Sequence, residues 1–162
     1  MPNDKSESQS LVKEGTEAPN IKLDTDAGEP FDLASLRGRN VVLYFYPKAD
    51  TPGCTKEACE FRDTTQKFKA ANTVVVGVSP DTSGAQAKFK QKFDLPFVLL
   101  ADTEHKAAET YGVWKEKSMY GKKHWGVDRT TFVIDPEGKI KKIFPKVKVD
   151  GHAEEVLAAL PQ

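Results

Sequence analysis

The chain has 162 residues, a length typical of one globular domain that buries a hydrophobic core without disulfide cross-links. Its 24 basic and 24 acidic residues give a formal net charge of zero, so nothing general points to a nucleic acid or an anionic membrane as partner. No apolar stretch approaches the roughly 18–20 residues that a membrane-spanning helix needs.

The first ten residues are polar and lack the hydrophobic stretch of a secretory signal. We expect residues 1–10 to form a disordered arm and residues 11–162 a single domain; the alternative is that the arm is the remnant of a longer targeting segment. The chain has only two cysteines, Cys54 and Cys59. Without a signal, they favour a reducing compartment and a cytoplasmic location, where a close cysteine pair is more often catalytic or metal-binding than structural.

Strand-like and helical segments alternate along the chain. Residues 41–46 are β-branched or aromatic, which is typical of a central strand buried on both faces. In chain order, the sequence predicts strands at 21–23, 31–33 and 41–46, a helix at 54–71, a strand at 74–78, a helix at 83–93, a strand at 97–100, a helix at 103–111, strands at 130–134 and 140–144, and a helix at 151–160. This order predicts the α/β class, with a thioredoxin-like fold in which helices flank both faces of a central mixed sheet.

Cys54 lies where a buried strand has ended and a helix begins. Helix N-termini carry free N–H groups and about half a positive charge, both of which favour a thiolate and lower a cysteine pKa. The alternative is that Cys54 is an inert buried residue, which is common for a lone cysteine. Its position beside a second cysteine favours the reactive interpretation.

Cys59 follows Cys54 by five residues. In an intact helix the two Cα atoms would lie roughly 8–9 Å apart on different faces. A disulfide needs Cα atoms within about 7 Å, so the pair can bond only if the first helical turns unwind. We therefore predict a reduced form with a full helix and an oxidised form in which this helix is locally melted. An unreactive helix cysteine remains the alternative for Cys59.

Thiolate formation alone cannot account for fast chemistry. A thiol with a pKa near 8.5 is roughly 3% ionised at pH 7, so complete ionisation gains only about 30-fold, or ~2 kcal/mol. The remainder must come from groups that orient the substrate and stabilise charge on a leaving oxygen. The candidates are the Thr51 hydroxyl, the N–H groups of Gly53 and Cys54, and a distant cation, for which we choose Arg129.

Residues 47–59 read Pro-Lys-Ala-Asp-Thr-Pro-Gly-Cys-Thr-Lys-Glu-Ala-Cys. This segment resembles the peroxiredoxins, in which Pro, three residues, Thr and two residues precede the reactive Cys. The position of the second cysteine is similar to that in the bacterioferritin comigratory protein, or peroxiredoxin Q, branch. Further matches are residues 45–47, 77–79, 119–121 and 129–135, and the resemblance extends from about Leu11 to Leu160.

The resemblance implies a peroxidase that needs no bound cofactor or metal and serves antioxidant defence. It implies that Cys54 attacks hydrogen peroxide or an organic hydroperoxide, and that Cys59 resolves the sulfenic acid within the same chain. Thr51 would hydrogen-bond the thiolate and the peroxide, Arg129 would hold both, and Pro47 would shield the site from water. Thioredoxin would be the reductant, and members of this branch are often monomers.

Two other functions remain open from the residues alone. A disulfide oxidoreductase without peroxidase activity usually has two residues between its cysteines, and four occur here. A copper carrier could use Cys54, Cys59 and His124 as soft ligands, although this spacing places the two sulfurs on different helix faces.

Other conspicuous residues have simpler interpretations. We expect His105, His124 and His152 to be surface or hydrogen-bonded histidines. Residues 115–123 are rich in lysine, and we expect a solvated loop beside the active site rather than a nucleic-acid patch. Trp125 is a candidate for the substrate mouth or for thioredoxin docking, and residues 139–148 have the pattern of a half-buried outer strand.

Overall fold

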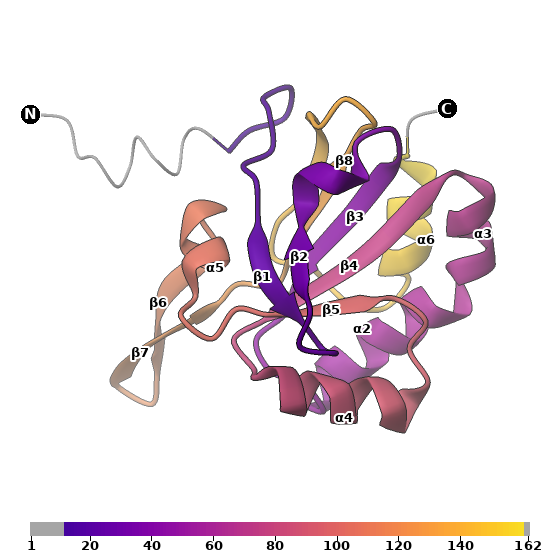
Figure 1. The fold of residues 1–162 in the computed structure, drawn as a ribbon. Helices are drawn as coiled ribbons and strands as arrows, with labels where there is room; N and C mark the ends of the chain where they lie inside the picture. The colour runs from indigo at the N-terminus through magenta and orange to yellow at the C-terminus, as the bar shows by residue number, and fades with distance from the viewer. Residues whose placement is uncertain (1–11, 161–162) are drawn as a thin grey trace, which may run out of the picture.

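The computed structural model describes residues 12–160, built around a seven-stranded sheet in the order β2-β1-β5-β4-β3-β8-β9 (Figure 1). The predicted arm, residues 1–10, lies outside the described residues. The strands are β1 (Lys22–Thr25), β2 (Pro30–Asp32), β3 (Asn40–Phe45), β4 (Thr73–Ser79), β5 (Val98–Ala101), β8 (Thr130–Ile134) and β9 (Ile140–Phe144). The helices are η1 (Leu33–Leu36), α2 (Pro52–Asp63), α3 (Thr65–Ala70), α4 (Ser83–Phe93), α5 (Lys106–Thr110) and α6 (His152–Ala158).

The strand pairing brings distant segments to one end of the sheet. Strands β3, β4 and β5 are parallel, whereas β8 is antiparallel to β3, with Phe45 opposite Thr130. The chain that leaves β3 toward α2 and the residue that enters β8 therefore meet at the same sheet edge. Carboxyl ends of parallel strands are where α/β proteins commonly place ligand sites.

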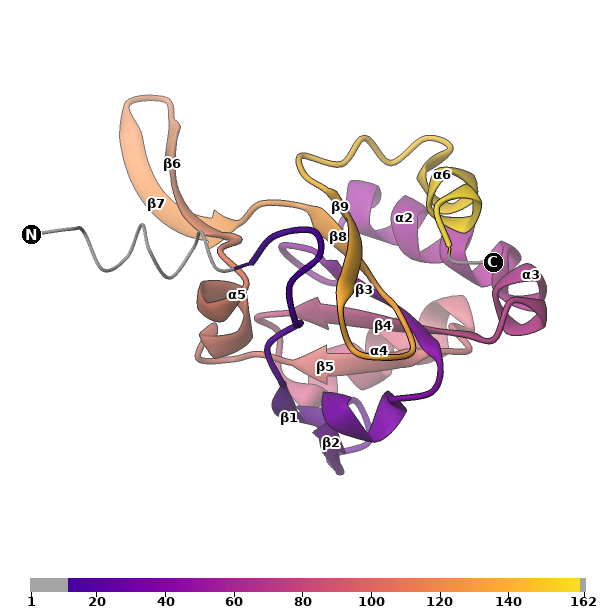
Figure 2. The same cartoon turned by 90° about the horizontal axis from the view of Figure 1, so that it is seen from above.

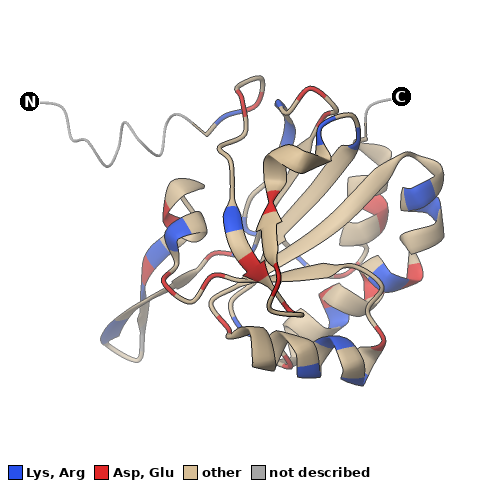
Figure 3. Cartoon of the chain, viewed as in Figure 1, with Lys and Arg blue, Asp and Glu red and all other residues tan. Residues whose placement is uncertain are grey.

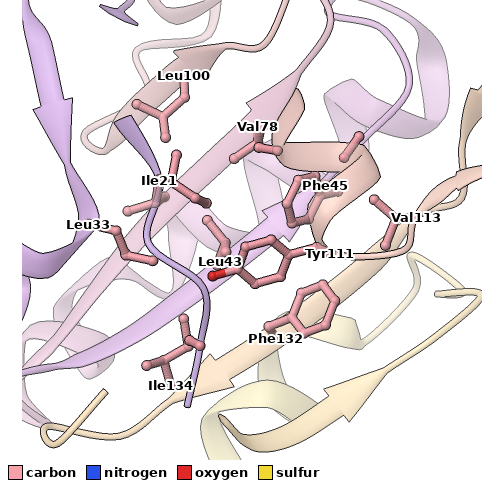
Figure 4. Packing of buried hydrophobic residues seen from close by; sticks show 14 of the residues in the cluster. Ile21, Leu33, Leu43, Phe45, Val78, Leu100, Tyr111, Val113, Phe132 and Ile134 are labelled. Atoms are coloured by element: carbon pink, nitrogen blue, oxygen red, sulfur yellow. The ribbon is translucent and has the colours of Figure 1, made fainter. Parts of the chain in front are cut away.

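The two faces of the sheet bury different helices. In β3, Val41, Leu43 and Phe45 point to one core, whereas Val42 and Tyr44 point to the other, as the alternation of a strand requires. The first core also receives η1 and α5; Figure 4 shows its side chains. The second core is covered by α2, α3, α4 and α6. The predicted mixed sheet with helices on both faces is confirmed.

The prediction of one continuous helix over residues 54–71 is wrong. The structure divides it into α2 and α3 at Thr64. The Thr64 hydroxyl donates to the Glu60 carbonyl at 2.9 Å, and the Thr65 hydroxyl donates to Phe61 O at 3.1 Å. Hydroxyl groups that bond back to the preceding turn bend or interrupt helices.

The predicted helix over residues 103–111 is shorter than expected. His105 has the left-handed φ of 48°, and α5 begins only after it. The buried Asp102 carboxylate then accepts from the N–H groups of Ala107 at 3.1 Å and Ala108 at 2.9 Å. These bonds satisfy N–H groups that the start of a helix leaves without partners.

The lysine-rich segment is a hairpin, so its prediction as a loop is wrong. Strands β6 (Trp114–Met119) and β7 (Lys122–Val127) pair antiparallel and project from the body of the molecule (Figure 2). Tyr120 and Gly121 at the tip both have positive φ, 54° and 76°, as a tight hairpin turn requires. In Figure 3 blue bands mark the lysines of the hairpin, and blue and red segments are both spread along the rest of the chain.

The end of the chain agrees with expectation. Asp135 Oδ1 accepts from the N–H groups of Glu137 and Lys139, both at 2.9 Å, and forms the predicted turn between β8 and β9. Strand β9 is the half-buried edge of the sheet. Within residues 12–160, no helix is long and apolar enough to cross a bilayer.

Candidate active site

Cys54 lies in the first turn of α2, the helix that follows β3 in the chain. Thr51 is the N-cap residue with an extended backbone, and Pro52 fills the first helical position, where its missing N–H costs nothing. The Cys54 side chain is 1% exposed, Cys59 is partly buried, and both thiols are free. This is the helical arrangement that we predicted for the reduced form.

Arg129 reaches the sulfur from the start of β8, the strand next to β3. It immediately precedes β8, and its Nη2 donates to Cys54 Sγ at 3.3 Å. A Cβ atom on Gly53 would lie 3.2 Å from Nη2, so a glycine before the cysteine leaves room for the guanidinium. The structure thus brings together Cys54 and Arg129, which are 75 positions apart in the chain.

Glu57 is a site residue that our sequence reasoning missed. Its Oε1 accepts from Arg129 Nη1 at 2.7 Å, and its side chain is 1% exposed. Burial raises the pKa of Glu57 to about 7, although Arg129 opposes this rise. Burial also disfavours the Arg129 charge, but Glu57 and Cys54 outweigh it and raise the pKa of the guanidinium. The available signal was an acidic residue three positions after Cys54, on the buried stripe of the helix.

Thr51 and Pro47 lie on the loop before α2, in different settings. The Thr51 hydroxyl donates to the Lys48 carbonyl at 2.8 Å. Its single proton is therefore not available to the Cys54 sulfur in this arrangement, which differs from the bond to the thiolate that the family resemblance implies. Pro47 is exposed, and its shielding of the site stays a prediction.

Two buried oxygen atoms near the sulfur have no hydrogen-bond partner among the described residues. They are the Tyr44 hydroxyl and Glu57 Oε2. Burial, followed by the nearby Tyr46, Glu57 and Cys54, holds the pKa of Tyr44 well above its usual range. Most buried polar groups are paired, so these atoms mark a region whose packing serves something other than maximal stability.

The arrangement can therefore stabilise and use a sulfur nucleophile. The helix N-terminus and the Arg129 guanidinium both place positive charge beside Cys54 Sγ. Glu57 fixes the guanidinium so that one nitrogen faces the sulfur. Residues 12–160 contain no group of three or more His, Cys, Asp or Glu side chains that could hold a metal ion.

Comparison of the sequence with known proteins gives a consistent set of relatives. The model of the AhpC/TSA family matches residues 15–143. A putative peroxiredoxin bcp of Coxiella burnetii is 52% identical over 149 residues, covering 92% of this chain and 99% of the relative. The peroxiredoxin Bcp of Bacillus subtilis is 48% identical and covers 92% and 95%, respectively.

Solved structures that resemble this chain also include bacterioferritin comigratory and peroxiredoxin Q proteins. A cysteine-to-serine mutant of Xylella fastidiosa PrxQ superposes with a TM-score of 0.86 at 34% identity, covering 91% of this chain and 94% of that one. The Xanthomonas campestris bacterioferritin comigratory protein, described for its alkyl peroxide reduction activity, gives 0.82 at 38% identity, with coverage of 86% and 88%. These likenesses confirm the predicted thioredoxin-like fold.

Proposed function

Because this chain belongs to the AhpC/TSA family, among its Bcp and peroxiredoxin Q members, we propose that Cys54 is the attacking thiolate of its peroxidase activity. The protein is a thiol-dependent peroxidase, an oxidoreductase with an antioxidant role. The observation that carries the assignment is the 3.3 Å bond from Arg129 to the buried Cys54 sulfur.

In the first step the Cys54 thiolate attacks the terminal oxygen of a hydroperoxide. The S–O bond forms as the O–O bond breaks, so sulfur loses two electrons and becomes a sulfenic acid, while the leaving oxygen departs as hydroxide or alkoxide and takes a proton. Arg129 and the N–H groups at the start of α2 stabilise the negative charge as it moves. Thr51 orients the peroxide, and Pro47 limits the access of water.

In the second step the Cys59 thiol attacks the sulfenic sulfur, forming a disulfide and releasing water. Cys59 is the only other cysteine in the chain. In two Xanthomonas campestris peroxiredoxin Q mutants the replaced cysteines lie thirty-six positions apart, compared with five here. The short separation requires the first turns of α2 to unwind before the bond can close.

The cycle ends when an external dithiol reduces the disulfide. Thioredoxin supplies the two electrons, and the reduced pair lets α2 refold around Cys54. We extend the proposal to a single catalytic domain over residues 11–162, acting as a cytoplasmic monomer. The single domain is supported by the seven-stranded sheet, which includes both β1 and β9 and is covered by α6.

Two cysteine variants test the proposal. Cys54→Ser should lose peroxide reduction with every reductant, as followed by hydrogen peroxide consumption. Cys59→Ser should form one sulfenic acid at Cys54, detected by mass spectrometry after trapping with dimedone, but lose turnover with thioredoxin. Peroxide consumption by Cys54→Ser at the wild-type rate would refute the attacking role. Normal turnover of Cys59→Ser with thioredoxin would refute the resolving role alone.

A further inference from the structure

The peptide bond between Lys48 and Ala49 is held at both of its polar ends. Its N–H, from Ala49, donates to Asp81 Oδ2 at 2.7 Å. Its carbonyl, from Lys48, accepts the Thr51 hydroxyl at 2.8 Å. Because a peptide unit is planar, fixing the N–H also fixes the direction of the carbonyl. The Asp81 carboxylate thereby controls the group to which Thr51 is bonded.

Asp81 is itself tied to the interior of the domain. The Ser79 hydroxyl donates to the same Oδ2 atom at 2.6 Å, and Gln86 Nε2 donates to Ser79 Oγ at 2.8 Å. The fully buried Gln86 also donates to the Leu100 carbonyl at 2.9 Å and accepts from the Tyr46 hydroxyl at 2.5 Å. The carboxylate is thus anchored to β4, α4 and β5, which are rigid parts of the fold.

We propose that Asp81 is a positioning residue for the peroxide reaction, acting through the Lys48–Ala49 peptide on the Thr51 hydroxyl. This inference rests on the proposed attack by Cys54. Since the Thr51 proton is committed to Lys48, the Thr51 oxygen offers its lone pairs to the peroxide. It accepts the O–H of the oxygen that sulfur attacks, a proton that stays on this oxygen in the sulfenic acid. Every hydroperoxide carries this O–H, whatever its other substituent.

Electrostatics alone would give Asp81 the opposite effect. A carboxylate disfavours further negative charge nearby, so on charge alone its removal would favour the reaction with peroxide. If charge were the main contribution, both Asp81→Ala and Asp81→Asn would speed the reaction with peroxide. If positioning is the main contribution, Asp81→Ala slows it, while Asp81→Asn, whose amide oxygen can still accept from Ala49, preserves it.

The experiment compares two reactions of Cys54 in the reduced full-length protein. One is oxidation by hydrogen peroxide, and the other is alkylation by the neutral reagent iodoacetamide, which needs a thiolate but no oriented peroxide. We expect Asp81→Ala to lower the peroxide rate constant at least about tenfold, because small displacements of orienting groups have large effects on rate. Alkylation should remain within about twofold, and Asp81→Asn should keep the peroxide rate within about threefold.

Asp135→Ala is the matched control. The Asp135 carboxylate also accepts from turn N–H groups, but it follows β8, whereas Arg129 of the site precedes it. It should change neither rate. If Asp81→Ala does not fold, Ser79→Ala is the second variant, with a peroxide rate about threefold lower and unchanged alkylation. The proposal is overturned if the folded variant reacts with peroxide like the wild type, or if both rates fall in parallel. A wild type that does not react with peroxide would instead refute the proposed function.

Discussion

The two cores of this protein differ in how they treat polar groups. The core under η1 and α5 is built from aliphatic and aromatic side chains such as Phe45 and Phe132. The hydroxyl of Tyr111 at its edge is satisfied by the Pro19 carbonyl. The core under α2, α3, α4 and α6 also contains Cys54 and stands beside the buried Glu57.

Stability and chemistry are therefore divided between the two faces of one sheet. On the side of η1 and α5, the buried Asp102 carboxylate is bonded to N–H groups at the start of α5, and the apolar side chains around it contribute burial energy. The side covered by α2, α3, α4 and α6 holds the Cys54 sulfur, the buried Glu57 carboxyl and the Tyr44 hydroxyl, which has no hydrogen-bond partner among the described residues. In our proposal, α2 must also unwind. Variants on each face test whether this division holds.

The largest effect is expected from removing one buried ring from each core. Phe132 packs against Phe45 and Tyr111, whereas Phe61 on α2 packs against Tyr44 and Phe68. Phe132→Ala and Phe61→Ala should each lower the free energy of unfolding by about 3–5 kcal/mol, measured by urea denaturation. Only Phe61→Ala should also speed the closure of the Cys54–Cys59 disulfide, because it loosens α2. Equal closure rates in the two variants would mean that the faces are not functionally distinct.

A smaller effect, of about 3 kcal/mol, follows from the buried carboxyl. The pKa of Glu57 is raised from 4.5 to about 7, so the unfolded chain releases this proton first as pH rises. The wild type therefore loses stability between pH 4.5 and 7 relative to Glu57→Gln, by about 3 kcal/mol at ~1.36 kcal/mol per pH unit. Urea denaturation of both proteins across this range measures the difference.

Asp102 provides the comparison on the other face. Burial raises its pKa too, but the N–H groups of Ala108 and Ala107 oppose the rise. Asp102→Asn should therefore show a pH-dependent difference of the same sign and smaller size. A difference between Glu57→Gln and wild type that does not vary with pH would contradict the account of Glu57.

Next in size is the replacement Arg129→Lys. A lysine keeps the charge but cannot present two fixed nitrogens, one to Glu57 and one to Cys54. We expect the rate constant of Cys54 with peroxide to fall about 10²-fold in stopped-flow measurements, or ~2.7 kcal/mol. The control is Arg62→Lys on α2, the helix that carries Cys54. The Arg62 guanidinium donates to the Phe93 carbonyl, and this variant should react like the wild type. A normal rate for Arg129→Lys would show that charge alone suffices.

The sequence predicted most elements because their signals are local. The β-branched run of β3 and the turn residues before β9 depend only on neighbours in the chain, and both predictions were confirmed. The hairpin of β6 and β7 was missed because its lysines are solvated whether the segment forms a loop or a hairpin. The division of α2 from α3 was missed because the apolar periodicity of the sequence continues through Thr64 and Thr65. The hydroxyl bonds by which these residues interrupt the helix do not change that periodicity.

The site was predictable only in part for the same reason. Cys54 at a helix start is a local feature, and Cys59 follows within the same helix. Arg129 could be chosen as a cation at the start of a strand, but its role rested on the family resemblance, since 75 positions separate it from Cys54. The partnership of Glu57 with Arg129 spans 72 positions. Such pairs depend on which strands become neighbours, which a periodic pattern does not specify.

The smallest effect is expected from Tyr44→Phe, which removes only the unpaired buried hydroxyl. Losing a buried polar group without a partner should stabilise the reduced protein by about 1 kcal/mol, measured by urea denaturation. Because Tyr44 packs against Phe61 on α2, the same change should slow disulfide closure and increase sulfinic acid at Cys54 under excess peroxide, as detected by mass spectrometry. Tyr46→Phe is the matched control: it breaks the bond to Gln86 and should be destabilising. If Tyr44→Phe destabilises the protein as much as Tyr46→Phe does, the Tyr44 hydroxyl has a hydrogen-bond partner. The core under α2 then has no unpaired polar group whose burial cost is relieved when α2 unwinds.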